Sequence, residues 1–417
     1  MKKIQEIKNS KIQGILGVNY MYFIKNTVFM SFPVLIGSLM KLVQNIAFAR
    51  LTDKDTYGQF IFIISVISIL SIISLPGIKV PTVKAISLKK TSAYKTLNFV
   101  KTKYSLIGSL ICFAVAVYYF IGNNRPFSYS LLLTAVLFVP YCGLNLWTSF
   151  YTGRKQFKKL AFLLSVIYIL STLAILLALK MGYSLPVLVT ASIIFYALFN
   201  VALTFKTGLP GNAAPEEISG DVRLAKHLTF LESFGTLFSN IDKILLAFFA
   251  NYSVLAVYQI ASSFHNQFKS LLQMETGLLL PKLSEVKKDA AFMKIRKRFA
   301  LITVVSVILG ITGYFITKPV MIILFSDKYD SSVPYAEILM LFLGIGFPSR
   351  VIKTLFEAHS CIKELYILNL VIPAVSVVLM VPLIYLWGIS GAVFAICFYW
   401  TASLVSSYYL AFYTHHE

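Results

Sequence analysis

Charged side chains are scarce in this sequence. Only 13% of the 417 residues are Asp, Glu, Lys or Arg, whereas 58% are hydrophobic. Soluble domains carry charge on roughly a quarter of their residues, so this composition excludes an ordinary soluble domain. Apolar runs of about 20 residues are long enough to cross a bilayer as helix, and the sequence holds twelve of them. We therefore predict an all-α, polytopic membrane protein with twelve transmembrane helices.

Acidic residues are scarcer still. The chain has 17 Asp and Glu against 38 Lys and Arg, a formal net charge of +21. Twenty-seven basic residues lie before the first span or in alternate connections, six lie in the connections on the other side, and five lie within spans. The positive-inside rule then places both termini in the cytoplasm. This pattern explains the charge without nucleic acid and makes anionic lipid head groups the expected partners of the basic segments. The longest of these segments, 79–103, is predicted to be a surface helix.

Signals for enzyme chemistry are also missing. The sequence contains neither a GxxxxGKS/T phosphate loop nor an HExxH zinc motif. Its four cysteines stand singly, so no spacing indicates a disulfide or a metal site. The basic start is not followed by the pattern of a removable signal peptide. We predict a protein that is not an enzyme and that carries no metal or other cofactor.

The chain divides at one stretch rich in Gly and Pro. Residues 206–226, with GLPGNAAPEEISGD at their centre, form a predicted cytoplasmic linker between an N-terminal six-helix bundle (1–205) and a C-terminal one (227–417). A shift of roughly two hundred residues brings Lys41 near Lys243 and Tyr57 near Tyr258. The order of such matches favours a duplicated unit, with a pseudo-two-fold axis along the membrane normal.

Polar residues interrupt several of the predicted spans. Glu232, Asp242 and Lys243 lie in the span predicted for 227–250, and Lys41 lies on one face of the first span with Ser38 and Asn45. A charge at the centre of a membrane helix costs about 2.5–3.5 kcal/mol on insertion scales, so such clusters mostly face water or a partner helix. In the next span a polar face recurs at steps of three and four: Gln259, Ser262, Asn266, Lys269 and Gln273. We predict a polar cavity between the two bundles.

The buried cations are the candidate binding groups of that cavity. Lys41 and Lys243 are predicted to face each other across the pseudo-axis, with Lys269 nearer the cytoplasm. Such a ladder suits an anionic head group such as a diphosphate, because Arg grips it with two hydrogen bonds and Lys acts as a point charge. The predicted substrate-binding residues are Lys41, Lys243, Lys269, Arg350, Lys353, Asn45 and Asn266.

Internal pairing is the structural alternative for these charges. Glu357 lies one turn from Lys353, and Asp242 or Glu232 are able to neutralise Lys243 or Lys269 across helices. Neighbouring residues do not share a helix face, so Asp242 and Lys243 are not expected to pair with each other. The carboxylates are also candidates for coupling transport to H+ or Na+, because their charge is able to change as the cavity changes sides. These coupling candidates are Glu232, Asp242 and Glu275.

Five motifs resemble polysaccharide flippases of the Wzx kind, in the multidrug/oligosaccharidyl-lipid/polysaccharide (MOP) exporter superfamily. The resemblance covers nearly the whole chain and depends on the order and spacing of its motifs. It implies a fold like that of the superfamily's MATE transporters. The motifs are ARLTDKDTYGQF from Ala49, SLPGIKVPTVKAI from Ser74, SNIDKILLAFFANYSVLAVYQIA from Ser239, LLLPKLSEVKK from Leu278 and GISGAVFAI from Gly388.

The resemblance implies the substrate and the location. Such proteins move an undecaprenyl-diphosphate-linked oligosaccharide, an O-antigen or related repeat unit, from the inner to the outer leaflet of the bacterial inner membrane. That role places the protein in lipopolysaccharide or capsule biosynthesis, with a polymerase and other polysaccharide assembly proteins as partners. Twelve spans, against the fourteen typical of peptidoglycan-precursor flippases, argue against that branch of the superfamily.

Two other functions stay open from the sequence. A multidrug or cation antiporter of the same superfamily needs a more acidic cavity than these buried cations provide. A polysaccharide polymerase needs acid-base groups in an outward loop. The longest such connection, between Lys318 and Ser332, offers only Asp327 and Asp330.

Overall fold

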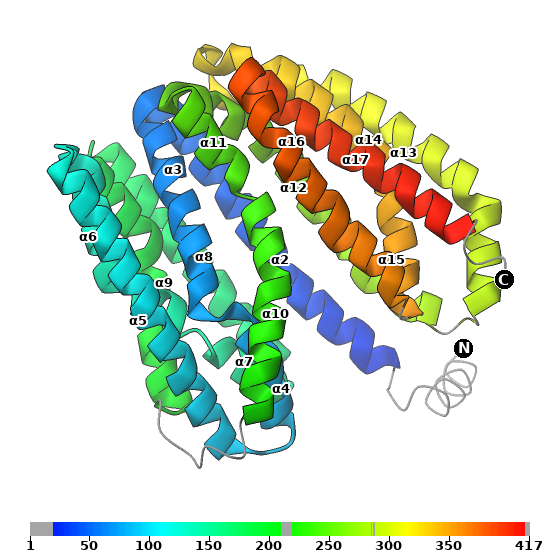
Figure 1. Ribbon diagram of the computed structural model, residues 1–417, viewed down its shortest axis with the longest axis horizontal. Coiled ribbons are helices and arrows are strands. Elements are labelled where there is room, and N and C mark those ends of the chain that lie inside the picture. The colour runs from blue at the N-terminus through cyan, green and yellow to red at the C-terminus, as the bar shows by residue number, and fades with distance from the viewer. Residues whose placement is uncertain (1–19, 210–218, 285, 287, 360, 413–417) are drawn as a thin grey trace.

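The protein is all-helical throughout the part that the structure describes. The computed structural model describes residues 20–209, 219–284, 286, 288–359 and 361–412, and every regular element within them is a helix (Figure 1). The predicted fold class is therefore confirmed.

The first half of the chain supplies six of the twelve predicted spans. The short turns η1 (Ser71–Ser74) and η2 (Pro76–Ile78) and the helix α4 (Lys79–Ser87) lie between its second and third spans. Its fourth span is a helix continued through the π-helical turn η3 (Val139–Gly143). The spans are α2 (Tyr20–Leu51), α3 (Lys54–Leu70), α5 (Thr91–Ile121), α6 (Arg125–Phe138) with α7 (Trp147–Gly153), α8 (Phe157–Lys180) and α9 (Leu185–Thr207).

The second half supplies the other six spans. Its third and fourth spans are joined by the turn η5 (Asp327–Ser332), and its fifth passes through a second π-helical turn, η6 (Ile367–Val371). The spans are α10 (Ser219–Phe238) with α11 (Ile241–Phe249), α12 (Tyr252–Ser284), α13 (Lys288–Phe325), α14 (Val333–Ala358), α15 (Ile362–Tyr366) with α16 (Ile372–Trp387), and α17 (Ile389–Phe412).

Length and composition make this a multi-pass membrane protein. Within the described residues, ten of these spans are long and apolar enough to cross a membrane. The two others are α10 with α11, which a break divides, and α12, which carries the predicted polar face. Both therefore need shelter from lipid on at least one side.

Helix packing repeats between the two halves. In the first half α5 packs on α6, α8 on α9, and α6 on α9; in the second half the equivalent pairs are α13 with α14, α16 with α17, and α14 with α17. A buried tyrosine also joins the first two spans of each half: Tyr57 donates to Asn45 Oδ1 at 2.9 Å, and Tyr258 donates to Asp242 Oδ2. This repetition is what a duplicated six-helix unit requires.

Two local predictions are wrong. The segment 79–103 is not a surface helix, because α5 begins at Thr91 and carries Lys101 into the interior with an exposed fraction of 1%. The span predicted for 227–250 is not continuous either. It breaks at Ser239 and Asn240, whose side chains donate hydrogen bonds to the carbonyls of Gly235 and Thr236 at 2.8 Å. Short polar side chains compete in this way with the helix's own hydrogen bonds.

The halves meet closely at the hairpin end, where the turns at Thr52–Asp53 and Ala250–Asn251 lie. There α3 packs on α12, and the Arg50 guanidinium donates to the carbonyls of Leu324 and Ile323 at 3.0 and 2.6 Å. At the linker end, where α9 ends and α10 begins, α10 rests on η2, and the Gly77 N–H donates to Thr229 Oγ1 at 3.0 Å. Figure 1 shows the halves converging near α3 and α11 and spreading apart toward α4 and α15.

Gly58 tests the contact at the hairpin end. A Cβ there would lie 1.8 Å from the Tyr252 carbonyl oxygen, a backbone atom that has no rotamer to change. We expect Gly58→Ala to lower the free energy of unfolding by about 1–3 kcal/mol, as overpacking does, measured by thermal unfolding in detergent. Gly220→Ala is the control, since open space surrounds Gly220 on α10 and Ala is the better helix former. Equal stability of the two variants would contradict this contact.

Candidate functional site

Three adjoining pockets form a chamber that reaches from the first half into the second. The first of them has walls from both halves, and the other two are lined by residues of the second half. We name them after a cation in each: the Lys41 pocket of about 630 Å³, the Lys243 pocket of about 90 Å³ and the Arg350 pocket of about 390 Å³. Asn266 lines the first two, while Lys269 and Trp400 line the last two. We call the three together the central chamber.

The Lys41 pocket lies between α2, α8 and α9, with α12 along one side. Lys41 is exposed to it, and its neighbours on the same face of α2 make polar contacts. Gln44 Nε2 donates to Thr172 Oγ1 at 2.8 Å, and the hydroxyls of Ser38 and Ser270 lie 2.9 Å apart. Two members of the polar face predicted for the first span, Ser38 and Lys41, therefore face this pocket, and Ser38 joins α2 to α12.

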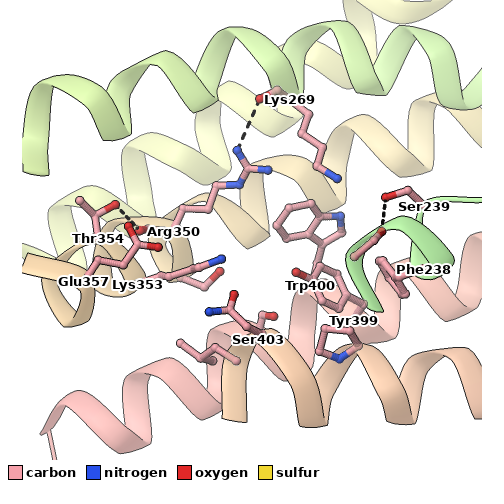
Figure 2. A pocket seen from close by; sticks show the side chains of 15 residues that line it. Phe238, Ser239, Lys269, Arg350, Lys353, Thr354, Glu357, Tyr399, Trp400 and Ser403 are labelled. Carbon is pink, nitrogen blue, oxygen red and sulfur yellow. Dashed lines mark hydrogen bonds between the residues drawn. The ribbon is translucent and has the colours of Figure 1, made fainter. Parts of the chain in front are cut away.

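The Arg350 pocket is built around Trp400 of α17, which is 3% exposed. Figure 2 shows the side chains of Lys269 and Arg350 converging on this ring. The Lys269 Nζ lies 5.7 Å and the Arg350 guanidinium carbon 5.2 Å from its centroid, within the range of cation–π attraction. The ring rests on Gly346 of α14, where an added Cβ would lie 2.1 Å from it. A glycine thus admits the aromatic surface that holds both cations.

A second polar group of the Arg350 pocket lies nearer the linker end. Lys353 is half-buried on α14, and Glu357, one turn further on, is exposed. Their charges interact, and Arg350 also acts on Lys353. The Arg350 Nη1 donates to the Lys269 carbonyl at 3.4 Å, which fixes α14 to α12 (Figure 2). Glu357 therefore offsets only part of the positive charge here.

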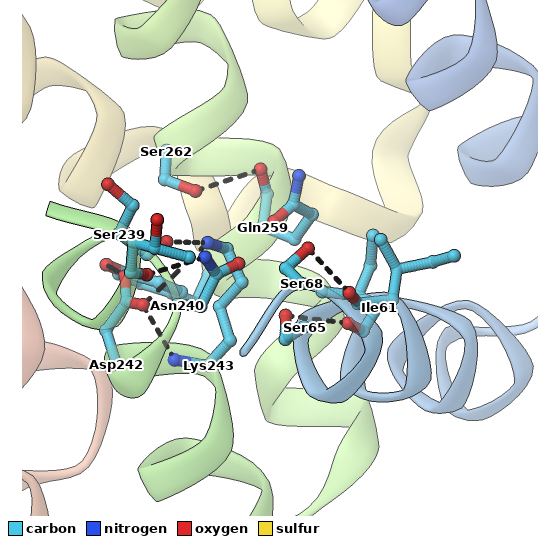
Figure 3. Close-up of polar contacts among 12 residues, drawn as sticks. Ile61, Ser65, Ser68, Ser239, Asn240, Asp242, Lys243, Gln259 and Ser262 are labelled. Atoms are coloured by element: carbon cyan, nitrogen blue, oxygen red, sulfur yellow. Dashed lines mark hydrogen bonds and ion pairs between the residues drawn. The ribbon is translucent and has the colours of Figure 1, made fainter. Parts of the chain in front are cut away.

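The Lys243 pocket lies at the break between α10 and α11. Asp242 Oδ2 accepts a hydrogen bond from the buried Tyr258, and its Oδ1 lies 3.8 Å from Lys243 Nζ (Figure 3). The expectation that Asp242 and Lys243 do not pair is therefore wrong. Because the helix begins anew at Ile241, the Lys243 side chain turns back and donates to the Ser239 carbonyl, which brings its amine beside Asp242.

The chamber is positively charged. Among the described residues that line it, five are cations and two are carboxylates, Asp242 and Glu357. The charges of Lys41 and Lys243 act on each other, as do those of Lys269 and Arg350. Like charges held together in a medium of low dielectric constant favour a bound anion. The cations are Lys41, Lys243, Lys269, Arg350 and Lys353.

The structure places two of the predicted residues elsewhere and does not describe the side chain of a third. Asn45 is 2% exposed and lines none of the three pockets, because its side chain accepts the Tyr57 hydrogen bond between α2 and α3. Glu232 is exposed on α10 and acts on Lys101 of the first half, rather than on Lys243 or Lys269. The side chain of Glu275 lies outside the described residues.

Sequence reasoning missed the aromatic and structural members of the site. Trp400 lies in an apolar span without any local polar pattern, so only the approach of α14 identifies it. The sequence could have identified Tyr258, because it matches Tyr57 in the internal repeat. The sequence could also have identified Lys101, because Asn98, Lys101 and Ser105 follow one another at steps of three and four and so share one helix face. In the structure all three are at most 1% exposed. In the described part of the chain, no three His, Cys, Asp or Glu side chains lie together as a metal site would need.

Two similar six-helix halves around a cationic chamber define a transporter of the MOP superfamily, and solved structures share this fold. The lipid II flippase MurJ, in an inward closed conformation, has 14% identity and a TM-score of 0.66, over 92% of this chain and 87% of that one. A point mutant of the MATE transporter VcmN of Vibrio cholerae has 16% identity and a TM-score of 0.61, over 93% and 96%. A MOP transporter from Pyrococcus furiosus, described as having a binding pocket of reverse polarity, has 11% identity and a TM-score of 0.56, over 93% and 94%.

The sequence carries the family assignment. Residues 23–287 match the family described as polysaccharide biosynthesis protein, and the chain belongs to that family. No curated protein matches the chain. The predicted superfamily is confirmed.

The two buried tyrosines test the charge on Asp242. Tyr258→Phe removes a hydrogen bond to a buried carboxylate, and Tyr57→Phe removes one to a neutral amide. We expect Tyr258→Phe to lower the free energy of unfolding by about 1.5–3 kcal/mol and Tyr57→Phe by about 0.5–1.5 kcal/mol, measured by thermal unfolding in detergent. Equal losses would show that Asp242 is not charged in the folded protein.

Proposed function

We propose that this protein is a flippase that moves an undecaprenyl-diphosphate-linked oligosaccharide, an O-antigen or related repeat unit, from the inner to the outer leaflet of the bacterial inner membrane. The observation that carries the proposal is the surplus of cations in a chamber enclosed by apolar helices. The family assignment adds the connection with polysaccharide biosynthesis. Lipopolysaccharide assembly is one such route, with a polymerase and related assembly proteins as partners.

The chamber suits the chemistry of such a lipid. Sugars and a diphosphate lose their hydrogen bonds with water in hydrocarbon, so they need a polar path across the membrane. Arg350 offers the diphosphate a two-pronged grip, with Lys269 and Lys353 as point charges beside it. Aromatic rings along both halves present flat apolar faces to the sugar rings, among them Tyr399 and Tyr196. The prenyl chain stays in lipid, where it is already soluble.

The direction of transport follows from the two ends. The halves are closed at the hairpin end by the contacts of Arg50 and Gly58. The walls of the chamber continue toward the linker end, to Pro33 on α2 and Glu357 on α14. The positive-inside rule makes the linker end cytoplasmic. This conformation then receives substrate from the cytoplasm, and rocking of the halves releases it on the other side.

Asp242 is the strongest candidate for ion coupling. It is 7% exposed, lines the chamber and shares its hydrogen bonds between Tyr258 and Lys243. Uptake of H+ or Na+ at this carboxylate weakens its attraction for Lys243. The charge of Lys243 lies where the charge of the substrate is expected. Glu232 and Glu275 remain secondary candidates for coupling.

The other two functions fit the chamber less well. A cation antiporter needs unpaired carboxylates, but Asp242 is paired with Lys243, and Glu357 interacts with Lys353. A polymerase needs a reactive outward loop. Here α13 extends to Phe325, and only the short turn η5 remains to carry Asp327 and Asp330.

The cation pair across the pseudo-axis gives the first test. We expect Lys41→Ala with Lys243→Ala to lower transport at least tenfold, or about 1.4 kcal/mol of transition-state stabilisation, because the chamber loses two of the five cations that favour an anionic substrate. Transport is measured in liposomes as the appearance of a prenyl-diphosphate-linked glycan in the opposite leaflet. Lys180→Ala, which removes a charge at the end of α8 outside the chamber, is the control. Unchanged transport by the double variant would refute the cation site.

The orientation of the protein in the membrane is tested by labelling introduced cysteines. We expect Asn123→Cys, at the hairpin end, to react with a membrane-impermeant maleimide in intact cells, and Lys89→Cys, at the linker end, to react only after permeabilisation. The four native cysteines are buried, so background labelling is low. The reverse labelling pattern would place the termini outside.

A further inference from the structure

A fourth pocket lies within the first half, outside the central chamber. It has a volume of about 300 Å³ and is enclosed by α5, α8, α9 and the turns beside α4 and α7. We call it the Lys101 pocket. It lies at the lower end of the size range of small-molecule sites. Its polar lining residues are Ser71, Ser74, Lys79, Lys101, Asn145, Thr148 and Asn200.

Lys101 brings a charge into this pocket that its protein partners do not balance. Its side chain is 1% exposed, and its Nζ donates to the Ser74 carbonyl at 3.0 Å. An ammonium group has three N–H donors, and no carboxylate of the described residues forms an ion pair with it. Glu232 acts on Lys101 at longer range, but it does not line the pocket. Within the described part of the chain the Lys101 Nζ donates one hydrogen bond, so donors remain for a ligand, and an anionic acceptor forms the strongest hydrogen bonds with an ammonium group.

Two further features describe that ligand. Lys79, exposed at the wall of the pocket, adds a second positive charge that acts on Lys101. The buried Asn145 Oδ1 accepts no hydrogen bond within the described part of the chain. The neighbouring Asn200, by contrast, accepts from Trp147 at 2.7 Å and donates to the carbonyls of Pro140 and Tyr141. The pocket thus offers two lysines and, in Asn145, the amide of a polar side chain.

The Lys101 pocket borders the central chamber. Tyr141 and Tyr196 line both it and the Lys41 pocket, and their rings meet edge to face with centroids 5.8 Å apart. The Lys41 pocket and the Lys101 pocket therefore share part of their walls, and sugars that lie in the first are next to the second.

We propose that the Lys101 pocket binds a carboxylate on the carried glycan, so that the substrate class is an acidic, uronate-bearing oligosaccharide. This rests on the proposed function. The diphosphate already has the richer set of cations, with an arginine, in the Arg350 pocket. Two lysines without an arginine match a single negative charge, and Asn145 matches a neighbouring sugar hydroxyl.

Binding is tested first, without transport. The full chain, purified in detergent, is heated with sodium glucuronate, and with glucose plus sodium chloride at the same ionic strength. We expect glucuronate alone to raise the unfolding temperature, and Lys101→Gln and Lys79→Gln to weaken its apparent affinity at least tenfold. Lys103→Gln, which alters an exposed lysine of the same helix whose Nζ lies over Phe99, keeps wild-type affinity. Because Lys79 is exposed, Lys79→Gln serves if Lys101→Gln does not fold.

The outcomes separate this inference from the proposed function. Equal stabilisation by glucose and glucuronate, or protection by acetate as strong as that by glucuronate, overturns the uronate site. In liposomes, wild-type protein is expected to move a prenyl-diphosphate disaccharide ending in glucuronate at least tenfold faster than one ending in glucose, and Lys79→Gln to abolish that preference. Equal rates for the two lipids overturn the inference. Specific glucuronate binding with no transport of either lipid overturns the proposed function instead.

Discussion

Positive charge in a medium of low dielectric constant is the constraint on which this structure depends. Five cations lie within spans whose other faces are apolar, and each of them lines a polar pocket. Lys269 and Arg350 are held by a tryptophan ring, Arg350 also by a backbone carbonyl, and Lys243 by a backbone carbonyl and by Asp242. Such partners keep the cations in place and leave their charge available to a ligand.

Duplication supplies the geometry for this arrangement. Each half repeats the same helix pairs, and the lysine on the first span of each half, Lys41 or Lys243, is close enough for its charge to act on the other. The halves have since diverged in how they use their own interiors. The second half concentrates its cations around Trp400, whereas the first buries Lys101 in a separate pocket. The two halves thus keep the same helix packing but place their buried cations differently.

The sequence predicts the fold and much of the chamber, because both follow from hydropathy and helix periodicity. Lys269, Arg350 and Lys353 are identified simply as charges inside apolar runs. The remainder depends on tertiary contacts. The break at Ser239 does not follow from hydropathy, because it reflects short polar side chains competing with the helix's own hydrogen bonds. Lys101 follows a run of other lysines, which indicates a surface helix, although its own helix face is buried. Trp400 requires the bare backbone of Gly346, which no local pattern reveals.

The seating of Trp400 on Gly346 also limits how the protein moves. With no side chain between the indole and α14, neither helix slides past the other without a collision, and the attached cations keep their spacing. The contact therefore holds α14 and α17 at a fixed spacing. Any rearrangement of the second half has to carry these two helices together, as one unit with the tryptophan ring between them.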